Sequence, residues 1–106
     1  MSEAFQLTHF ALDDLEMIVA HIAQDNLDAA IRVESAIIMA CRRLSRNPLI
    51  GSKHADVTPL PVRFWPVSQF PNYIIVYLPE SRPLQVVAIL HGMRDIPAIL
   101  PGRQPS

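Results

Sequence analysis

The spacing of apolar residues changes half-way along the chain, and this change restricts the fold more than any other feature. Up to about residue 46, apolar residues recur at intervals of three and four, as they do on one face of a helix. Beyond Pro48 and Gly51 they form runs of branched and aromatic side chains separated by turn formers, which is typical of strands. The sequence therefore predicts an α/β fold of the α+β kind, with a helical first half and an extended second half.

Two amphipathic helices are predicted in the first half, after a short strand at about residues 4–7. Thr8 is placed to cap the first helix, and Asn26 or Asp25 to cap the second. Pro48 and Gly51 end the second helix. The short link predicts an antiparallel hairpin. The apolar faces consist of Ala11, Leu15, Ile18, Val19 and Ile22 in the first helix, and Ala30, Val33, Ile37, Cys41 and Leu44 in the second.

Three strands are predicted in the second half, in the runs VRFWPV, NYIIVYL and LQVVAILH. The turn PESRP between the last two runs predicts an antiparallel hairpin. In the middle run both alternating faces are apolar, although the helix hairpin can cover only one face of a small sheet. The segment Ile96–Leu100 is short enough to cover only part of the second face. We therefore expect the sheet to keep an apolar surface for a partner.

Composition limits the class of protein. Half of the 106 residues are hydrophobic, 18% are charged, and the net charge is −1. We expect one domain over residues 1–106 with a real core, and no direct DNA binding by the chain alone, because such binding usually needs a basic surface. The single cysteine, together with the lack of a signal peptide and of a long apolar run, predicts a cytoplasmic protein without membrane association.

Neither a metal nor a cofactor is expected. The four histidines and the single cysteine lack the spacing of a metal site, and the three glycines form no phosphate-binding loop. Cys41 lies on an apolar helix face, which predicts a buried thiol. Arg42, Arg43 and Arg46 crowd the end of the second helix, where cations match the helix dipole; a target-binding patch is the alternative.

The candidates for catalysis are Arg63, His91 and Arg94. Cleavage of RNA without metal needs an acid, a base and cations that stabilise the phosphorane-like transition state. His91 could be acid or base, and the two arginines could bind phosphate. A structural explanation competes with this one: His91 ends a strand, Gly92 permits a special backbone conformation, and Arg94 can pair with Asp95. We favour the structural explanation and assign no catalytic residue.

The order of these segments resembles a known family. Four segments carry the resemblance. Two are the predicted helices ALDDLEMIVAHIA and AAIRVESAIIMACRRLSRNPLIG, the third is VRFWPVSQFPNYIIVY with Asn72-Tyr73…Tyr77, and the fourth is the C-terminal motif His91-Gly92-x-Arg94-Asp95. Together, from about residue 7 to residue 100, they resemble the ParE branch of the RelE/ParE toxin superfamily, whose members are the toxins of type II toxin–antitoxin modules noted for plasmid stabilisation. The resemblance implies a β-α-α-β-β-β-α fold, with a helix hairpin packed on a small, mainly antiparallel sheet.

The resemblance also implies partners and their contact residues. A cognate antitoxin, ParD-like with a ribbon-helix-helix DNA-binding domain, is expected to fold its flexible C-terminal part onto the toxin. We expect the antitoxin to contact Phe64, Trp65, Ile75, Tyr77 and Ile89. We expect the target to contact Arg63, Tyr73, His91 and Arg94.

Two activities divide the superfamily: ParE-like members inhibit DNA gyrase by binding, and RelE-like members cleave mRNA on the ribosome. Asn72 stands where a nuclease of this kind would be expected to carry an arginine, and the chain is not basic. We therefore expect a gyrase inhibitor and not an enzyme. The alternatives are a ribosome-dependent mRNA endonuclease, with the ribosome as partner, and a degenerate member that retains only antitoxin binding.

Overall fold

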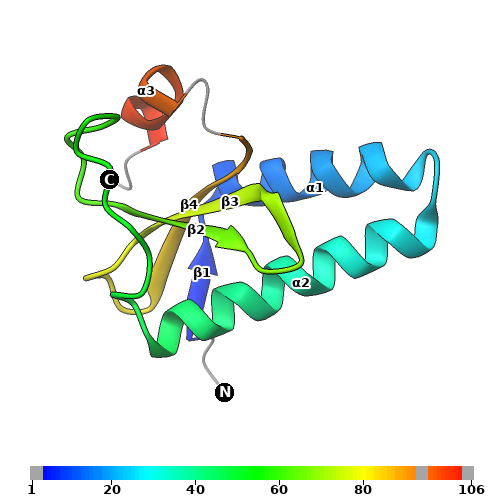
Figure 1. Ribbon diagram of the computed structural model, residues 1–106, viewed down its shortest axis with the longest axis horizontal. Coiled ribbons are helices and arrows are strands. Elements are labelled where there is room, and N and C mark those ends of the chain that lie inside the picture. The colour runs from blue at the N-terminus through cyan, green and yellow to red at the C-terminus, as the bar shows by residue number, and fades with distance from the viewer. Residues whose placement is uncertain (1–3, 93–95, 104–106) are drawn as a thin grey trace.

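The computed structural model describes residues 4–92 and 96–103 (Figure 1). Along the chain the elements are β1 (Phe5–Leu7), α1 (His9–Ala23), α2 (Leu27–Arg46), β2 (Arg63–Val67), β3 (Phe70–Leu78), β4 (Leu84–His91), α3 (Ile96–Ile99) and the short 3₁₀ helix η1 (Leu100–Arg103). This order of a strand, a helix hairpin, three strands and a short helix confirms the predicted α+β fold.

Local signals set the ends of the two long helices. The Thr8 hydroxyl accepts a hydrogen bond from the Ala11 amide at 3.2 Å, which caps α1. Of the two candidates for the second cap, Asn26 is used: its side-chain oxygen accepts from the Ala29 amide at 2.9 Å. In Figure 1 both helices continue beyond the strands, so the turn that joins them lies away from the sheet.

The sheet has four strands in the order β1-β4-β3-β2. Strands β2, β3 and β4 are antiparallel neighbours, whereas β1 pairs in parallel with β4. The register places Arg63 of β2 opposite Tyr77 of β3, and His91 of β4 opposite Tyr73 of β3. The strand β2 forms one edge of the sheet, and its pairing with β3 is irregular between Pro66 and Val67.

The helix hairpin covers one face of the sheet and encloses the larger core. Burial of the apolar stripes of α1 and α2 against the strands supplies the main driving force for this layer. Cys41 is fully buried here, as predicted. The buried residues of this core are Phe5, Ala11, Leu15, Val33, Ile37, Cys41, Leu44, Val67, Ile75, Tyr77, Leu84, Val86 and Ile89.

The second face of the sheet is also covered, and this corrects the expectation of a bare apolar surface. Ile96 and Leu100, at the starts of α3 and η1, are 0% and 1% exposed and pack against this face. The segment between α2 and β2 adds Val57, Leu60 and Val62. In Figure 1 this segment and α3 lie on the same side of the molecule. The chain's own elements therefore account for an apolar strand with two buried faces.

Candidate functional site

Tyr73 and His91 form a small aromatic pair at the open end of the β3–β4 hairpin. Their ring centroids are 5.1 Å apart and the rings are inclined at 65°. The His91 side chain is exposed, and Tyr73 is half-buried. Gly92 follows with φ +80°, which confirms that glycine is used here for its backbone conformation, and its amide donates to the Asn72 carbonyl at 2.8 Å. Arg94, the other candidate of this motif, lies outside the described residues.

Arg63 faces a different part of the molecule, where it binds backbone. One terminal guanidinium nitrogen donates to the Gly51 carbonyl at 2.7 Å and to the Leu49 carbonyl at 3.3 Å. The buried Nε has no hydrogen-bond partner among the residues that the structure describes. The side chain therefore holds the turn that follows α2, and in this conformation part of its donor capacity is already used within the chain.

Arg63 and His91 occupy different backbone positions along the sheet. They pair with Tyr77 and Tyr73, which are four positions apart on β3, so they differ along the sheet by about 13 Å at ~3.3 Å per residue. A group that transfers a proton must come within about 3 Å of the reacting atom. Within the described residues, the strand register therefore separates the backbone positions of these two candidates.

Tyr77 completes the contacts that hold the turn after α2. Its hydroxyl donates to the Pro48 carbonyl at 2.7 Å and accepts from the Gly51 amide at 3.0 Å. Burial raises the pKa of Tyr77, whereas the hydrogen bond from Gly51 and the charge of Arg63 lower it, and burial is the largest of the three effects. A Cβ atom on Gly51 would lie 2.5 Å from the Tyr77 hydroxyl oxygen, so glycine is required here for space.

The five predicted antitoxin contacts stay a prediction, and the structure shows that four of them are buried in the free chain. Phe64, Ile75, Tyr77 and Ile89 are at most 2% exposed, so in the free chain their side chains belong to the two cores and are closed to a partner. The sequence predicts these four residues as apolar strand residues, but it does not show which other elements cover their side chains. Trp65 is the exception, because its side chain is half-buried and reaches the surface.

Trp65 lies in a groove between α2 and the β2–β3 hairpin. This α2–β2 groove encloses about 310 Å³ and is formed chiefly by Ala36, Met39, Ala40 and Arg43 of α2 and by Trp65 and Val67 of β2. The Arg43 guanidinium carbon lies 5.5 Å from the centre of the Trp65 ring, which is within cation–π range. A second hollow adjoins it, lined by Met39, Arg42, Arg43, Arg46 and Asn47. The arginine cluster seen in the sequence therefore borders an accessible apolar groove.

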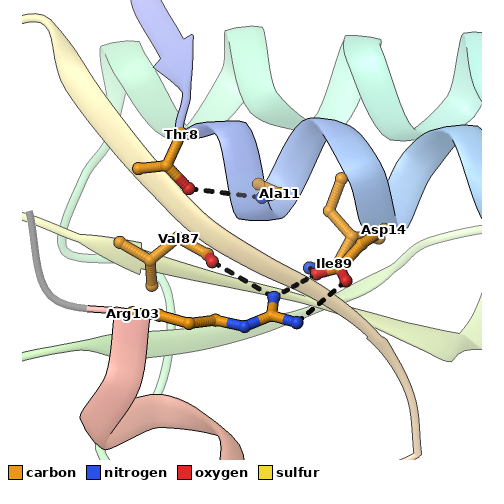
Figure 2. Close-up of polar contacts among 6 residues, drawn as sticks. All are labelled: Thr8, Ala11, Asp14, Val87, Ile89 and Arg103. Carbon is orange, nitrogen blue, oxygen red and sulfur yellow. Dashed lines mark hydrogen bonds and ion pairs between the residues drawn. The ribbon is translucent and has the colours of Figure 1, made fainter.

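Sequence reasoning missed a polar network that joins the C-terminal segment to α1 and β4 (Figure 2). Both carboxylate oxygens of Asp14 pair with the two terminal nitrogens of Arg103, at 3.0 Å for Oδ1 and at closer range for Oδ2. Asp14 Oδ2 also accepts from the Ile89 amide at 3.0 Å, and Arg103 donates to the Val87 carbonyl at 3.4 Å. The guanidinium also lies 5.4 Å from the Phe10 ring centre. These contacts hold η1 against the edge of β4.

Two properties concern the described residues as a whole. Among them, no helix is long and apolar enough to cross a membrane. Within the same residues, no group of three or more histidine, cysteine, aspartate or glutamate side chains could hold a metal ion.

Comparison with protein families gives a match over nearly the whole chain. The protein-family model described as "ParE toxin of type II toxin-antitoxin system, parDE" matches residues 5–96. The chain belongs to the ParE toxin family. This confirms the resemblance seen in the sequence, and membership in a parDE system implies a ParD antitoxin as partner. No curated protein sequence matches this ParE toxin.

A solved structure confirms the fold of the ParE toxin. The structure is titled "Chromosomal ParDE TA system from P. aeruginosa", and a chain in it superposes with a TM-score of 0.69 at 17% sequence identity. The match covers 83% of the ParE toxin and 94% of that chain. At this identity the likeness establishes the arrangement of helices and strands and leaves the contact residues to be argued from the toxin's own side chains.

Proposed function

We propose that this ParE toxin acts in the cytoplasm by binding DNA gyrase, and that a ParD-like antitoxin with a ribbon-helix-helix domain neutralises it. The observation that carries the proposal is the separation of the backbone positions of Arg63 and His91 by about 13 Å along the sheet. A protein that inhibits by binding needs a surface complementary to its target and catalyses no reaction. Such a protein does not require Arg63 and His91 to lie close together.

The use of Arg63 supports the same conclusion. Stabilisation of a phosphorane-like transition state requires a cation aimed at the phosphate oxygens. Arg63 instead donates to the Leu49 and Gly51 carbonyls and fixes the turn after α2. These bonds hold the guanidinium against the end of α2, so the side chain is not free to turn toward a phosphate without breaking them. Inhibition by binding leaves them intact.

The exposed pair of His91 and Tyr73 provides the most accessible predicted target contacts. An exposed imidazole packs edge-on against a half-buried phenol, and the pair presents aromatic surface with polar groups at the end of the hairpin. Tyrosine is one of the residues enriched among those that contribute most to binding at protein interfaces. We propose that Tyr73 and His91, with Arg94 on the segment that follows, belong to the surface that contacts gyrase.

Expression in a bacterium, with and without the adjacent antitoxin gene, tests the proposal. The toxin alone should stop growth and remove negative supercoils from a reporter plasmid while messages stay intact, and co-expression of the antitoxin should restore both growth and supercoiling. Messages cut at ribosomal A-site codons with unchanged plasmid topology would replace the proposal with the endonuclease. Normal growth at a high level of folded toxin would instead indicate a degenerate member that only binds antitoxin.

A further inference from the structure

We propose that a pocket beside the start of β2 binds a small organic molecule that has one carboxylate group and an apolar body. This loop pocket encloses about 310 Å³ between the segment that follows α2 and the turn from β3 to β4. It shares no lining residue with the α2–β2 groove, and neither Tyr73 nor His91 lines it. The inference does not rest on the proposed function. Three features of the pocket lead to it.

The first feature is an unused edge of the Arg63 guanidinium. Its Nη1 donates to the Leu49 and Gly51 carbonyls, whereas Nε and Nη2 make no hydrogen bond with the described residues. Nη1 is the terminal nitrogen on the side of Cδ, so the Nε hydrogen and one Nη2 hydrogen point in the same direction. Two parallel donors of this kind bind both oxygens of a carboxylate. Because a buried donor without a partner is costly, a ligand at this edge gains affinity by satisfying it.

The carboxylate reaches this edge after a small shift of the pocket lining, since Nε is enclosed in the free chain. Most of the lining lies between residues 49 and 62, which belong to no helix or strand. A segment without a regular ladder of hydrogen bonds opens at a low cost in free energy. The bonds that Nη1 makes meanwhile keep the guanidinium in position.

The second feature is a pair of further donors in the lining. Thr58 is 5% exposed although it is polar, and its hydroxyl accepts from the Leu60 amide at 3.2 Å but donates to none of the described residues. His54 lines the same pocket, and its ring stands edge-on to Phe64 with the centroids 5.0 Å apart. Hydroxyl and imidazole N–H groups both donate to carboxylate oxygens. The lining therefore offers more donors than its own residues use.

The third feature is a single excess positive charge among apolar walls. Lys53 and Arg63 in the lining exceed Glu80 by one charge, which one carboxylate balances and a phosphate dianion would reverse. Leu49 also lines the pocket and is 67% exposed, so the body of a ligand can cover its apolar surface. A few polar groups in a mainly apolar hollow of this volume are typical of small-molecule sites. The remaining apolar lining residues are Ala55, Pro59, Leu60, Pro61, Val62 and Pro79.

Titration of the purified toxin with benzoate, followed by proton–nitrogen correlation NMR, tests the site. The Nε–H signal of Arg63, identified by its loss in Arg63→Lys, should move downfield and saturate, because a hydrogen bond to a carboxylate deshields that proton. A Kd of about 1 mM is expected for a ligand of this size. Benzamide has nearly the same shape without the charge, and it should bind at least about tenfold more weakly.

Two variants of the lining, with a matched control, locate the binding. Thr58→Val removes the hydroxyl at nearly constant volume and Lys53→Glu reverses a charge, and each should raise the Kd for benzoate about three- to tenfold. Arg32→Glu makes the same charge change at an exposed position of α2 outside the pocket and should leave this Kd unchanged. Circular dichroism of each free variant establishes that it is folded.

Three results would overturn the inference. The first is the absence of a saturable shift of the Arg63 signal at a benzoate concentration about ten times the expected Kd. The second is binding of benzamide as tight as that of benzoate, which would remove the role of the carboxylate. The third is unchanged binding of benzoate in both Thr58→Val and Lys53→Glu, which would place the ligand elsewhere. None of these results bears on the binding of gyrase.

Discussion

The hydroxyl group of Tyr77 helps to hold the turn that follows α2, and Tyr77→Phe removes it without changing the shape of the core. Two partners lose a hydrogen bond: the Pro48 carbonyl at 2.7 Å and the Gly51 amide at 3.0 Å. Gly51 is buried, so water cannot readily replace the hydroxyl as its partner. The substitution should therefore loosen the link between the end of α2 and the sheet.

The expected cost is about 2–4 kcal/mol in the free energy of unfolding. A buried amide left unpaired costs roughly 1–3 kcal/mol, and the bond to the half-buried Pro48 carbonyl is worth about 1 kcal/mol. For a chain of this size each kcal/mol lowers the melting temperature by about 4–8 °C. Urea titration should show a lower midpoint with an unchanged slope, because the surface exposed on unfolding stays the same.

Tyr73→Phe is the matched control. Tyr73 lies on the same strand and the same face, is half-buried, and its hydroxyl makes no hydrogen bond with the described residues. It should change stability by less than about 0.5 kcal/mol, as expected for a side chain without such a feature. Equal losses in the two variants, or a loss below about 1 kcal/mol in Tyr77→Phe, would refute this account of the turn.

Three further predictions concern neighbouring features. Gly51→Ala should cost about 1–3 kcal/mol in urea unfolding, because its Cβ would meet the Tyr77 hydroxyl, and the cost should shrink when Tyr77→Phe is also present. Arg103→Met should speed hydrogen exchange at the Val87–Ile89 edge of β4, and unchanged exchange would remove the role assigned to its pair with Asp14. Burial raises the pKa of the Cys41 thiol from 9.0 to about 12. The free energy of unfolding should therefore be unaffected by this thiol below pH 9 and fall by about 1.4 kcal/mol per pH unit between pH 9 and pH 12, because only the unfolded chain loses the proton there. In Cys41→Ala the fall with pH should be less steep.

Local signals made most of the element order predictable. Thr8 and Asn26 mark helix starts through bonds to amides three residues away, and Gly92 marks a turn through its own backbone angle. Each of these effects acts within a few residues, so a single sequence displays it. The change of apolar spacing near Pro48 likewise separated the hairpin from the strands.

The cover of the second sheet face was not predictable in the same way. Val57, Leu60 and Val62 belong to a segment without regular spacing, and their packing on the sheet depends on how the segment folds back. From the sequence alone, apolar residues on both faces of β3 therefore predict a surface left for a partner. The structure shows that the same pattern results from a sheet covered by helices on one side and by a loop with a short helix on the other.

The candidate site was predicted less well than the fold, because it depends on distances through space. Asp14 and Arg103 are 89 positions apart, and no local pattern links them. The arginines at the end of α2 were visible in the sequence, but only the packing of β2 against α2 places Arg43 over Trp65. Arg63 is a charged residue in a predicted strand, which makes it a candidate site residue in the sequence, whereas its bonds to two backbone carbonyls depend on the fold.

Titration of gyrase with the purified toxin tests the central claim most directly. Because the proposed inhibition depends on binding alone, loss of supercoiling should follow the toxin concentration and saturate as the complex fills, and stoichiometric antitoxin should reverse it. The account is contradicted if gyrase keeps full supercoiling activity at a large excess of folded toxin while sub-stoichiometric toxin cuts messages on translating ribosomes.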